Sequence, residues 1–380
     1  MAEFKIAAVV TIYRPWSHAD VIVSRWLEPR AEDEVWGWGH PRTRIVSLYI
    51  DQVESDDTGR ALAARNGIPV VGSVSDALTL GAGGLAVDAV LLIGEHGGYP
   101  YNEIGQKMYP RKQLFDQVVQ VMQASGRFVP VYCDKHLSWN FAWAKEMVAT
   151  ARELGIPLMA GSSLPYSPLQ PPPAMTDDTL VEEVLAVAYD VPEAYGYHSI
   201  ESSLALLERR SGGERGVTSV RALRGSSVWE AMERGTWSRE LFDAAIFVSR
   251  RPRIPPDGWG TGSAEPEPIA FSLTHADGFT STHLILEGYV SDFSIAMKLR
   301  GDPRPHASCV MLGGPEDFFG HFAKLDSVIE DFFLSGRPAV PIERTLLATG
   351  AIAACMKALT QPGARFPTPE LEIPYRGLCR

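Results

Sequence analysis

Ionisable residues follow directly after two apolar, strand-like runs in the first half of the chain. Asp134, Lys135 and His136 come after the run FVPVYC, and Glu95 and His96 come after VLLIG. A lysine in such a place can donate a hydrogen bond to a substrate or carry a proton, and histidine changes its charge near neutral pH. Lys135 therefore predicts a hydrogen-bonding or proton-carrying position, and Glu95 and His96 predict a loop that lines a ligand site. The alternatives are a solvated loop lysine and a turn with polar decoration.

A second group of candidate residues lies further along the chain. His198 precedes a predicted helix at Ile200–Arg209, and Glu201 follows three residues later, so both side chains could lie on one helical face. This spacing indicates a second proton-carrying or substrate-binding position. A lone histidine is more often structural, and a helix-capping carboxylate counted from Ser199 accounts for Glu201 equally well.

The first 165 residues alternate between strand-like and helix-like segments. Strands that are apolar on both faces and alternate with helices are typical of a parallel sheet that is covered on both sides. We therefore predict a Rossmann-like, doubly wound α/β domain at residues 1–165. Its loops 11–18, 94–103 and 134–139 should converge on the carboxyl edge of the sheet. The predicted strands are Ile6–Ile12, Ile45–Ile50, Ile68–Val71, Val87–Ile93, Phe128–Cys133 and Ile156–Ala160.

The pattern changes after the proline-rich segment Tyr166–Ala174, whose four prolines can continue neither a helix nor a central strand. We predict a second domain at residues 166–380, an α+β domain with an open, mostly antiparallel sheet. Its strand-like runs are Val181–Tyr189, Ile269–Leu273, Ser281–Leu286 and Phe293–Leu299, and its closing helices are Phe322–Phe333 and Ile342–Leu359.

This order of elements resembles the Gfo/Idh/MocA superfamily of sugar and inositol oxidoreductases over nearly the whole chain. The family's Glu-Lys-Pro motif corresponds to DKH at 134–136, and its Asp-x-Gly-x-His motif corresponds to AYGYH at 194–198, where Ala194 replaces the carboxylate. The resemblance implies that Lys135 and His198 are the catalytic acid–base residues. It also implies NAD or NADP as the cofactor, a small carbohydrate-like substrate, and a homodimer or homotetramer.

The first turn departs from the dinucleotide-binding pattern, which needs glycines so that backbone N–H groups can approach the pyrophosphate. The turn reads TIYRPWSH, and no glycine occurs between Met1 and Val35. Arg14 could offer charge to phosphate instead, Ser17 could cap the helix, and Asp51 could bind ribose or be a simple turn residue. The predicted cofactor-binding residues are Tyr13, Arg14, Ser17, Asp51, Glu95, His96 and Asp134; the predicted substrate-binding residues are Tyr99, Asn102, His136 and Glu201.

Three functions follow from these residues. The first is an NAD(P)-linked oxidoreductase acting on a sugar, polyol or related hydroxy or keto compound. The second is a lyase, hydratase, isomerase or hydrolase of the same fold that has lost dinucleotide use, with or without a metal. The third is a non-catalytic sugar-binding or scaffold protein. No metal site is predicted, because the histidines and carboxylates show no tight ligand spacing such as HExxH; they are His18, Glu95, His96, Asp134, His136, His198 and Glu201.

Composition excludes several other classes of protein. The chain of 380 residues carries 35 basic and 46 acidic residues, a net charge of −11, and shows no basic run, which argues against nucleic-acid binding. No apolar run approaches the 20 or so residues of a membrane span. The N-terminus does not resemble a signal peptide, and the four cysteines are scattered. We therefore expect a cytoplasmic protein with reduced thiols and no membrane partner.

Overall fold

The computed structural model describes residues 3–253, 259 and 267–377, which form two compact units. Unit 1 comprises residues 1–100, 107–166 and 312–346, and unit 2 comprises residues 101–106, 167–311 and 347–380. Each unit has its own sheet. Cys133, Cys309 and Cys355 are buried free thiols, and Cys379 lies outside the described residues.

Unit 1 is built on a six-stranded parallel sheet in the order β3-β2-β1-β4-β5-β6. The central strands β1 and β4 are almost entirely buried, as expected for strands covered on both faces. The strand order reverses between β1 and β4, and ligands bind at such switch points in open α/β sheets. The strands are β1 (Lys5–Val10), β2 (Arg44–Ile50), β3 (Val70–Val71), β4 (Ala89–Ile93), β5 (Val131–Asp134) and β6 (Leu158–Gly161).

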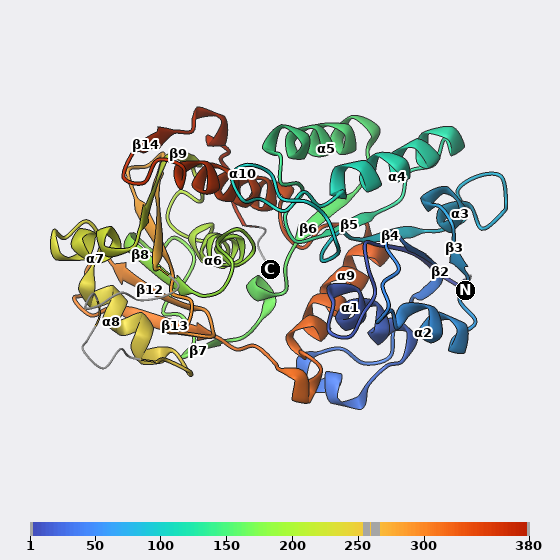
Figure 1. Ribbon diagram of the computed structural model, residues 1–380, viewed down its shortest axis with the longest axis horizontal. Helices are drawn as coiled ribbons and strands as arrows, with labels where there is room; N and C mark the ends of the chain where they lie inside the picture. Colours follow the sequence, from blue (N-terminus) through green and yellow to red (C-terminus); the bar gives the residue numbers. More distant parts are fainter. Residues whose placement is uncertain (1–2, 254–258, 260–266, 378–380) are drawn as a thin grey trace. The chain divides into compact units, whose positions relative to one another are not determined.

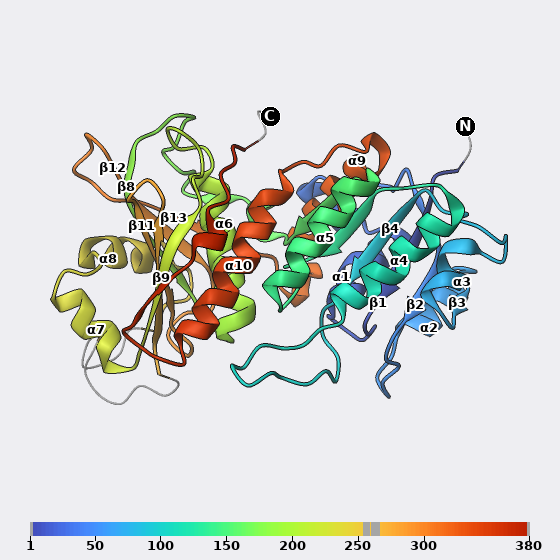
Figure 2. The same cartoon turned by 90° about the horizontal axis from the view of Figure 1, so that it is seen from above.

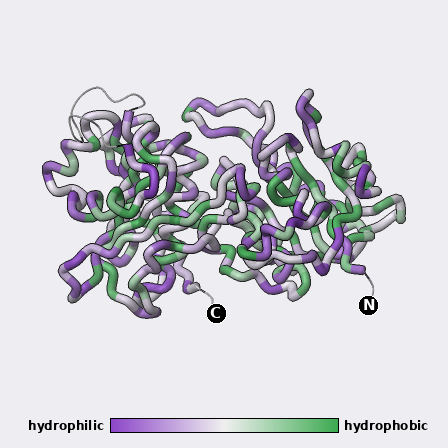
Figure 3. The backbone as a smooth tube through the Cα atoms, turned by 90° about the horizontal axis from the view of Figure 1, so that it is seen from below, coloured by the Kyte–Doolittle hydropathy of each residue, from purple (hydrophilic) through white to green (hydrophobic). Residues whose placement is uncertain are grey.

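Helices cover both faces of this sheet (Figure 1). Helices α4 and α5 lie on one face, and α1, α2 and α9 lie on the other. Hydrophobic residues gather in the interior strands, and hydrophilic ones lie in the outer loops (Figure 3). The helices are α1 (His18–Leu27), α2 (Gly59–Arg65), α3 (Val74–Thr79), α4 (Arg111–Ser125), α5 (Phe141–Leu154) and α9 (His321–Ser335).

Unit 2 contains an eight-stranded mixed sheet in the order β14-β9-β10-β11-β8-β12-β13-β7. Its strand pairs are antiparallel except for β11 with β8, and the sheet is open, with edges at β14 and β7. The strands are β7 (Leu169–Gln170), β8 (Val181–Ala188), β9 (Val217–Arg224), β10 (Ile269–His275), β11 (Thr280–Ile285), β12 (Ser294–Leu299), β13 (His306–Val310) and β14 (Arg365–Pro367).

Both faces of the second sheet are covered by helices of the same unit (Figure 2). Helix α6 (Pro192–Leu207) packs on one face, and α7 (Ser226–Glu233) and α8 (Arg239–Val248) pack on the other, while α10 (Ile342–Ala358) begins in unit 1 and continues in unit 2. Trp229, Trp237 and Phe242 of the α7–α8 region form a buried aromatic group against the sheet. The face that carries Leu185 and Leu284 is therefore already buried within the chain.

The predicted fold class, a doubly wound parallel-sheet domain followed by an α+β domain with an open, mostly antiparallel sheet, is confirmed. Several element boundaries differ from those predicted. Helix α6 begins at Pro192 rather than at Ile200, because a proline is well suited to the first helical turn. Residues 312–346, which the sequence assigns to the second domain, belong to unit 1, where α9 packs on α1. Among the described helices, none combines the length and apolarity needed to cross a membrane.

Candidate functional site

The loops after β1, β4 and β5 meet at the carboxyl edge of the first sheet, as the alternation of elements predicts. The Thr11 hydroxyl donates to the Glu95 backbone carbonyl at 2.7 Å, and the ring of His18 lies 5.3 Å from that of His96. Lys135, after β5, reaches back to the loop after β4. Adjacent parallel strands bring these polar residues together although they are far apart in sequence.

Lys135 lies in a buried charged cluster at this edge. Its Nζ is 3.1 Å from Oε1 of Glu95, and Arg111 at the start of α4 donates to the other Glu95 oxygen. Burial opposes ionisation of Glu95, but Lys135 and Arg111 outweigh it and hold the pKa of that carboxyl well below its usual range. One carboxylate thus holds two cations in place.

Two residues of this edge have an unfavourable left-handed backbone. Lys135 has φ of 63° and His96 has φ of 67°, a conformation that non-glycine residues seldom adopt. Each costs about 1–3 kcal/mol, and such strain persists where the surrounding structure fixes it, often at functional sites. The strained backbone at the tips of two converging loops supports a functional reading of this edge.

The neighbouring histidines are held neutral. Burial, reinforced by the Arg111 guanidinium at 3.2–3.3 Å from the ring nitrogens, holds the pKa of His136 well below its usual range. Burial, with His18 nearby, lowers the pKa of His96 to about 3. Nδ1 of His96 accepts a 3.5 Å hydrogen bond from the backbone N–H of His18, consistent with a neutral ring.

His18 and Asp134 form a close pair. Nδ1 of His18, the first residue of α1, is 2.6 Å from Oδ2 of Asp134. Asp134 is fully buried, and its other carboxylate oxygen has no hydrogen-bond partner among the described residues. The sequence-predicted residue Asp134 therefore orients a histidine, a role that its position alone did not reveal.

The β1–α1 turn is closed by the chain's own groups. Ser17 caps α1, as predicted, by accepting from the Asp20 N–H, and it also accepts from the Arg14 N–H. The side chain of Arg14 lies near two carboxylates, 4.0 Å from Glu54 and 3.9 Å from Asp56.

The side chain of Tyr13, in the same turn, packs into the hydrophobic core of unit 1. Its ring is buried against Gly59, where an added Cβ would come within 2.5 Å of the ring. Its hydroxyl lies 2.9 Å from the Ser24 hydroxyl, and burial raises the pKa of Tyr13. The Tyr13 side chain is thus part of the unit 1 core, which leaves it no free surface toward a ligand.

Asp51 directly follows β2 at the predicted edge and accepts hydrogen bonds from two tyrosines. The Tyr49 and Tyr99 hydroxyls donate to its two oxygens at 2.8 and 2.5 Å. Burial and the Asp51 charge raise the pKa of Tyr99, so the phenol stays protonated and donating. The side chain of Gln52, the residue after Asp51, accepts a hydrogen bond from the Gly98 N–H at 2.8 Å and so links this segment to the loop after β4. Tyr99 therefore contacts a predicted cofactor-binding residue.

The remaining predicted residues belong to unit 2. His198 and Glu201 lie on α6 and are buried, and the His198 ring is 5.9 Å from Phe293. Because α6 begins at Pro192, Ser199 is not its N-cap, and the capping explanation of Glu201 is wrong. Asn102 holds its own loop, with its side-chain oxygen accepting from the Gln106 N–H at 2.9 Å.

Arg111 and Asp326 are two of the buried charged residues that no sequence pattern singles out. Arg111 belongs to the polar stretch after Tyr99, where nothing in the pattern distinguishes it from a solvated neighbour. Asp326 lies in an amphipathic helix 190 positions downstream of His136. Both of its carboxylate oxygens are buried with no hydrogen-bond partner among the described residues. Burial raises the pKa of Asp326 well above its usual range, and Asp33 and Asp134 add to the effect, while Arg25 opposes it.

Replacing Asp326 by asparagine is expected to stabilise the protein at pH 7 by about 1–3 kcal/mol, because it removes a poorly solvated carboxyl group. The raised folded-state pKa means that wild-type stability falls as pH rises above the unfolded pKa of about 4. The gain should therefore be larger at pH 7 than at pH 4 in urea titrations. Asp331→Asn, an exposed change on the same helix, is the control; an equal or lower stability of Asp326→Asn at pH 7 would contradict the assignment.

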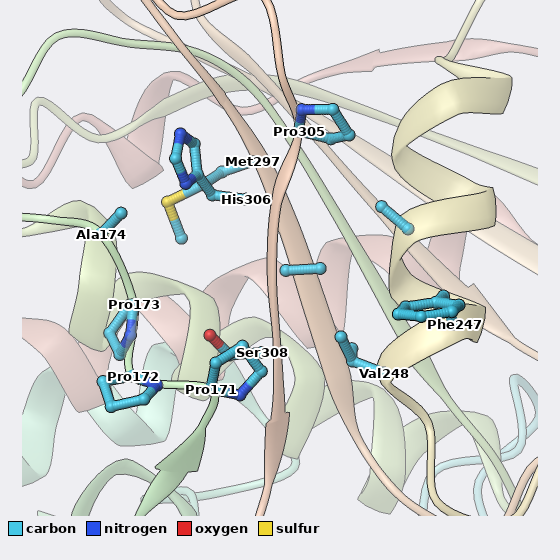
Figure 4. Close-up of a pocket in the computed structure, with 12 residues that line it drawn as sticks. Pro171, Pro172, Pro173, Ala174, Phe247, Val248, Met297, Pro305, His306 and Ser308 are labelled. Carbon is cyan, nitrogen blue, oxygen red and sulfur yellow. The ribbon is translucent and has the colours of Figure 1, made fainter.

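A separate pocket of about 480 Å³ lies on unit 2 beside β13. Pro171–Pro173 line one side, while Met297 and Phe247 contribute further apolar surface, and His306 supplies an ionisable side chain (Figure 4). None of the predicted site residues lines it. Among the described residues, no group of three or more histidines, cysteines and carboxylates is arranged to hold a metal ion.

No family model matches the chain, and no curated protein matches it in sequence. Solved structures do match over both units. GenD2 from gentamicin A biosynthesis, in complex with NAD, is 13% identical, with 97% of each chain covered and a TM-score of 0.59. A myo-inositol dehydrogenase from Corynebacterium glutamicum is 12% identical, covers 96% of this chain and 99% of its own, and has a TM-score of 0.57.

Scyllo-inositol dehydrogenase from Lactobacillus casei, with bound NAD(H) and scyllo-inositol, is 10% identical, covers 96% of this chain and 99% of its own, and has a TM-score of 0.59. This chain has the Gfo/Idh/MocA two-domain fold. At identities of 10–13% this likeness shows the fold alone.

Proposed function

We propose that this Gfo/Idh/MocA-fold chain is an enzyme acting at a hydroxyl- or carbonyl-bearing carbon of a small sugar or polyol. The observation that carries the proposal is Lys135: a buried lysine, on a strained backbone, at the carboxyl edge of an otherwise apolar sheet. Glu95 fixes the position of its ammonium group. A lysine so fixed can donate a hydrogen bond or a proton to a substrate oxygen and take a proton back.

The first candidate reaction is that of an oxidoreductase using a nicotinamide dinucleotide. Support comes from the fold neighbours, which include dehydrogenases solved with NAD or NAD(H). In this reading Lys135 and His198 would carry the alcohol proton, and Asp51 would bind the adenosine ribose of the cofactor. His136, Tyr99, Asn102 and Glu201 would contact the substrate. This candidate would use NAD or NADP as its cofactor and would form a homodimer or homotetramer.

The β1–α1 turn does not fit the pyrophosphate of such a cofactor. The Arg14, Trp16, Ser17 and His18 N–H groups all have partners within the chain, and Pro15 has no N–H. The partner of the Trp16 N–H is a carboxylate, that of Asp20 at 2.8 Å, which would repel a phosphate. Both Asp51 oxygens are likewise engaged. The chain's own groups therefore occupy the backbone N–H groups of this turn that a pyrophosphate would need.

The N–H groups of the β1–α1 turn already have partners within the chain, and this favours the second candidate, a non-redox enzyme of the same fold. A lyase, hydratase or isomerase needs groups that move protons at adjacent carbon and oxygen atoms, and it needs no pyrophosphate site. Lys135, whose ammonium group Glu95 holds in place, is suited to that chemistry.

Nucleotide binding decides between the two candidates. A cofactor with micromolar affinity, added at 1 mM, would stabilise the native state by about 4 kcal/mol. Because the N–H groups of the turn already have partners, we expect NAD(H) and NADP(H) at 1 mM to stabilise the native state by less than about 1.5 kcal/mol. A thermal-shift assay measures this stabilisation. The Asp51→Asn variant should match wild type, and Asp76→Asn is the surface control. A large shift that Asp51→Asn removes, together with NADH formation from an inositol, would establish the oxidoreductase instead.

A further inference from the structure

The His18–Asp134 pair has the geometry of an oriented acid–base group. Asp134 is fully buried and accepts from Nδ1 of His18 at 2.6 Å, which fixes the ring and directs its other nitrogen away from the carboxylate. Nε2 of His18 has no hydrogen bond among the described residues, and the side chain is 12% exposed. In the neutral ring that donates from Nδ1, Nε2 carries a lone pair available to accept a proton.

The surroundings of His18 favour this role over simple packing. The ring is held edge-on by His96 and by Phe322 of α9, with centroids at 5.3 and 5.0 Å. A ring needed only to fill this space would not require a buried carboxylate behind it. Asp134 immediately precedes Lys135, so the group that orients His18 and the proposed proton donor are adjacent on one strand end.

We propose that His18, oriented by Asp134, is a second acid–base catalyst on the same sheet edge as Lys135, and that the pair acts on an α-hydroxy ketone or aldehyde of the sugar or polyol class. This inference rests on the cofactor-free candidate above. The reaction it implies is an isomerisation through an enediol, which needs no oxidant or reductant.

Protons and electrons balance within the two residues. His18 Nε2 takes the proton from the carbon that bears the hydroxyl, and the C–H electron pair forms the C=C bond of the enediol as the carbonyl oxygen takes a proton from Lys135. The neighbouring hydroxyl then returns a proton to Lys135 as it becomes the new carbonyl. His18 finally gives its proton to the former carbonyl carbon, and both residues regain their initial states.

The test is solvent-isotope exchange without added nucleotide. Full-length protein is incubated in D2O with dihydroxyacetone, D-fructose, D-xylulose or the 2-ketone of myo-inositol, and loss of the C–H signal beside the carbonyl is followed by proton NMR. We expect wild type to exceed the buffer rate with at least one ketone. His18→Asn should lower that rate by about 10²–10⁴-fold, as should Lys135→Met. His40→Asn, an exposed histidine of unit 1, should leave it unchanged.

Asp134→Asn tests positioning, and it should lower kcat while leaving KM nearly unchanged, because the ring loses its orientation and the substrate contacts remain. If His18→Asn does not fold, as judged by its melting curve, His18→Gln replaces it. Exchange with none of the four ketones, or exchange only when NAD(H) is present, would overturn the inference. If Lys135→Met loses the exchange and both His18 variants keep it, His18 is not a catalyst of this reaction. The proposed role of Lys135 would then be retained.

Discussion

Replacing Lys135 by alanine is expected to lower turnover by about 10²–10⁴-fold, the usual contribution of a positioned proton-transfer group. The cause is the loss of the ammonium group that Glu95 holds at 3.1 Å. Steady-state kinetics with the substrate found by exchange or by nucleotide turnover measures the effect. Lys135→Arg should be nearly as impaired, because a guanidinium keeps the charge but does not release a proton at neutral pH.

The matched control for this variant is Lys145→Ala, which removes an exposed lysine from α5 of the same unit. The variant lacking Lys135 should still fold, because Glu95 keeps its pair with Arg111. Its stability loss should stay near 1–3 kcal/mol, read from a urea titration. Near wild-type turnover in a folded Lys135→Ala protein would exclude Lys135 from the mechanism and weaken the resemblance on which the His198 proposal depends.

The sequence predicts the position of the site better than its internal contacts. Apolar strands alternating with helices require a parallel sheet, and the carboxyl ends of its strands must then meet, so the grouping of Glu95, His96 and Lys135 follows from the pattern. The helix cap at Ser17 is also a local signal, since it depends on residues within one turn.

Long-range partners are not encoded in such local signals. The pairing of His18 with Asp134 joins residues 116 positions apart, and that of Arg111 with Glu95 becomes visible only when α4 is placed on the sheet. The sequence does not predict that residues 312–346 belong to unit 1. Helix α9 is amphipathic, and its composition does not say on which of the two sheets its hydrophobic side packs. The start of α6 at Pro192 was missed because Val191 provides no side-chain cap.

Replacing Glu95 by glutamine is expected to destabilise the protein by about 3–5 kcal/mol, the typical cost of leaving buried charges without their counter-ion. Lys135 and Arg111 would both then face a neutral amide. Urea titration at pH 7 measures the loss. The control is Glu28→Gln, which breaks an exposed pair with Arg65 at 3.2 Å and should cost no more than about 1 kcal/mol.

The dependence on pH separates this electrostatic effect from a packing effect. The pKa of Glu95 is held well below its usual range in the folded protein, so its contribution is present above the unfolded pKa of about 4.3 and is lost as pH falls toward the folded value. The difference between wild type and Glu95→Gln should therefore shrink on acidification. The difference in unfolding free energy between wild type and Asp326→Asn should also shrink at low pH. Its sign is opposite to that for Glu95→Gln, because ionisation of the Asp326 carboxyl destabilises the folded protein. A Glu95→Gln cost that is unchanged between pH 7 and pH 3 would point to altered packing and would leave the charged cluster without its proposed role in holding Lys135.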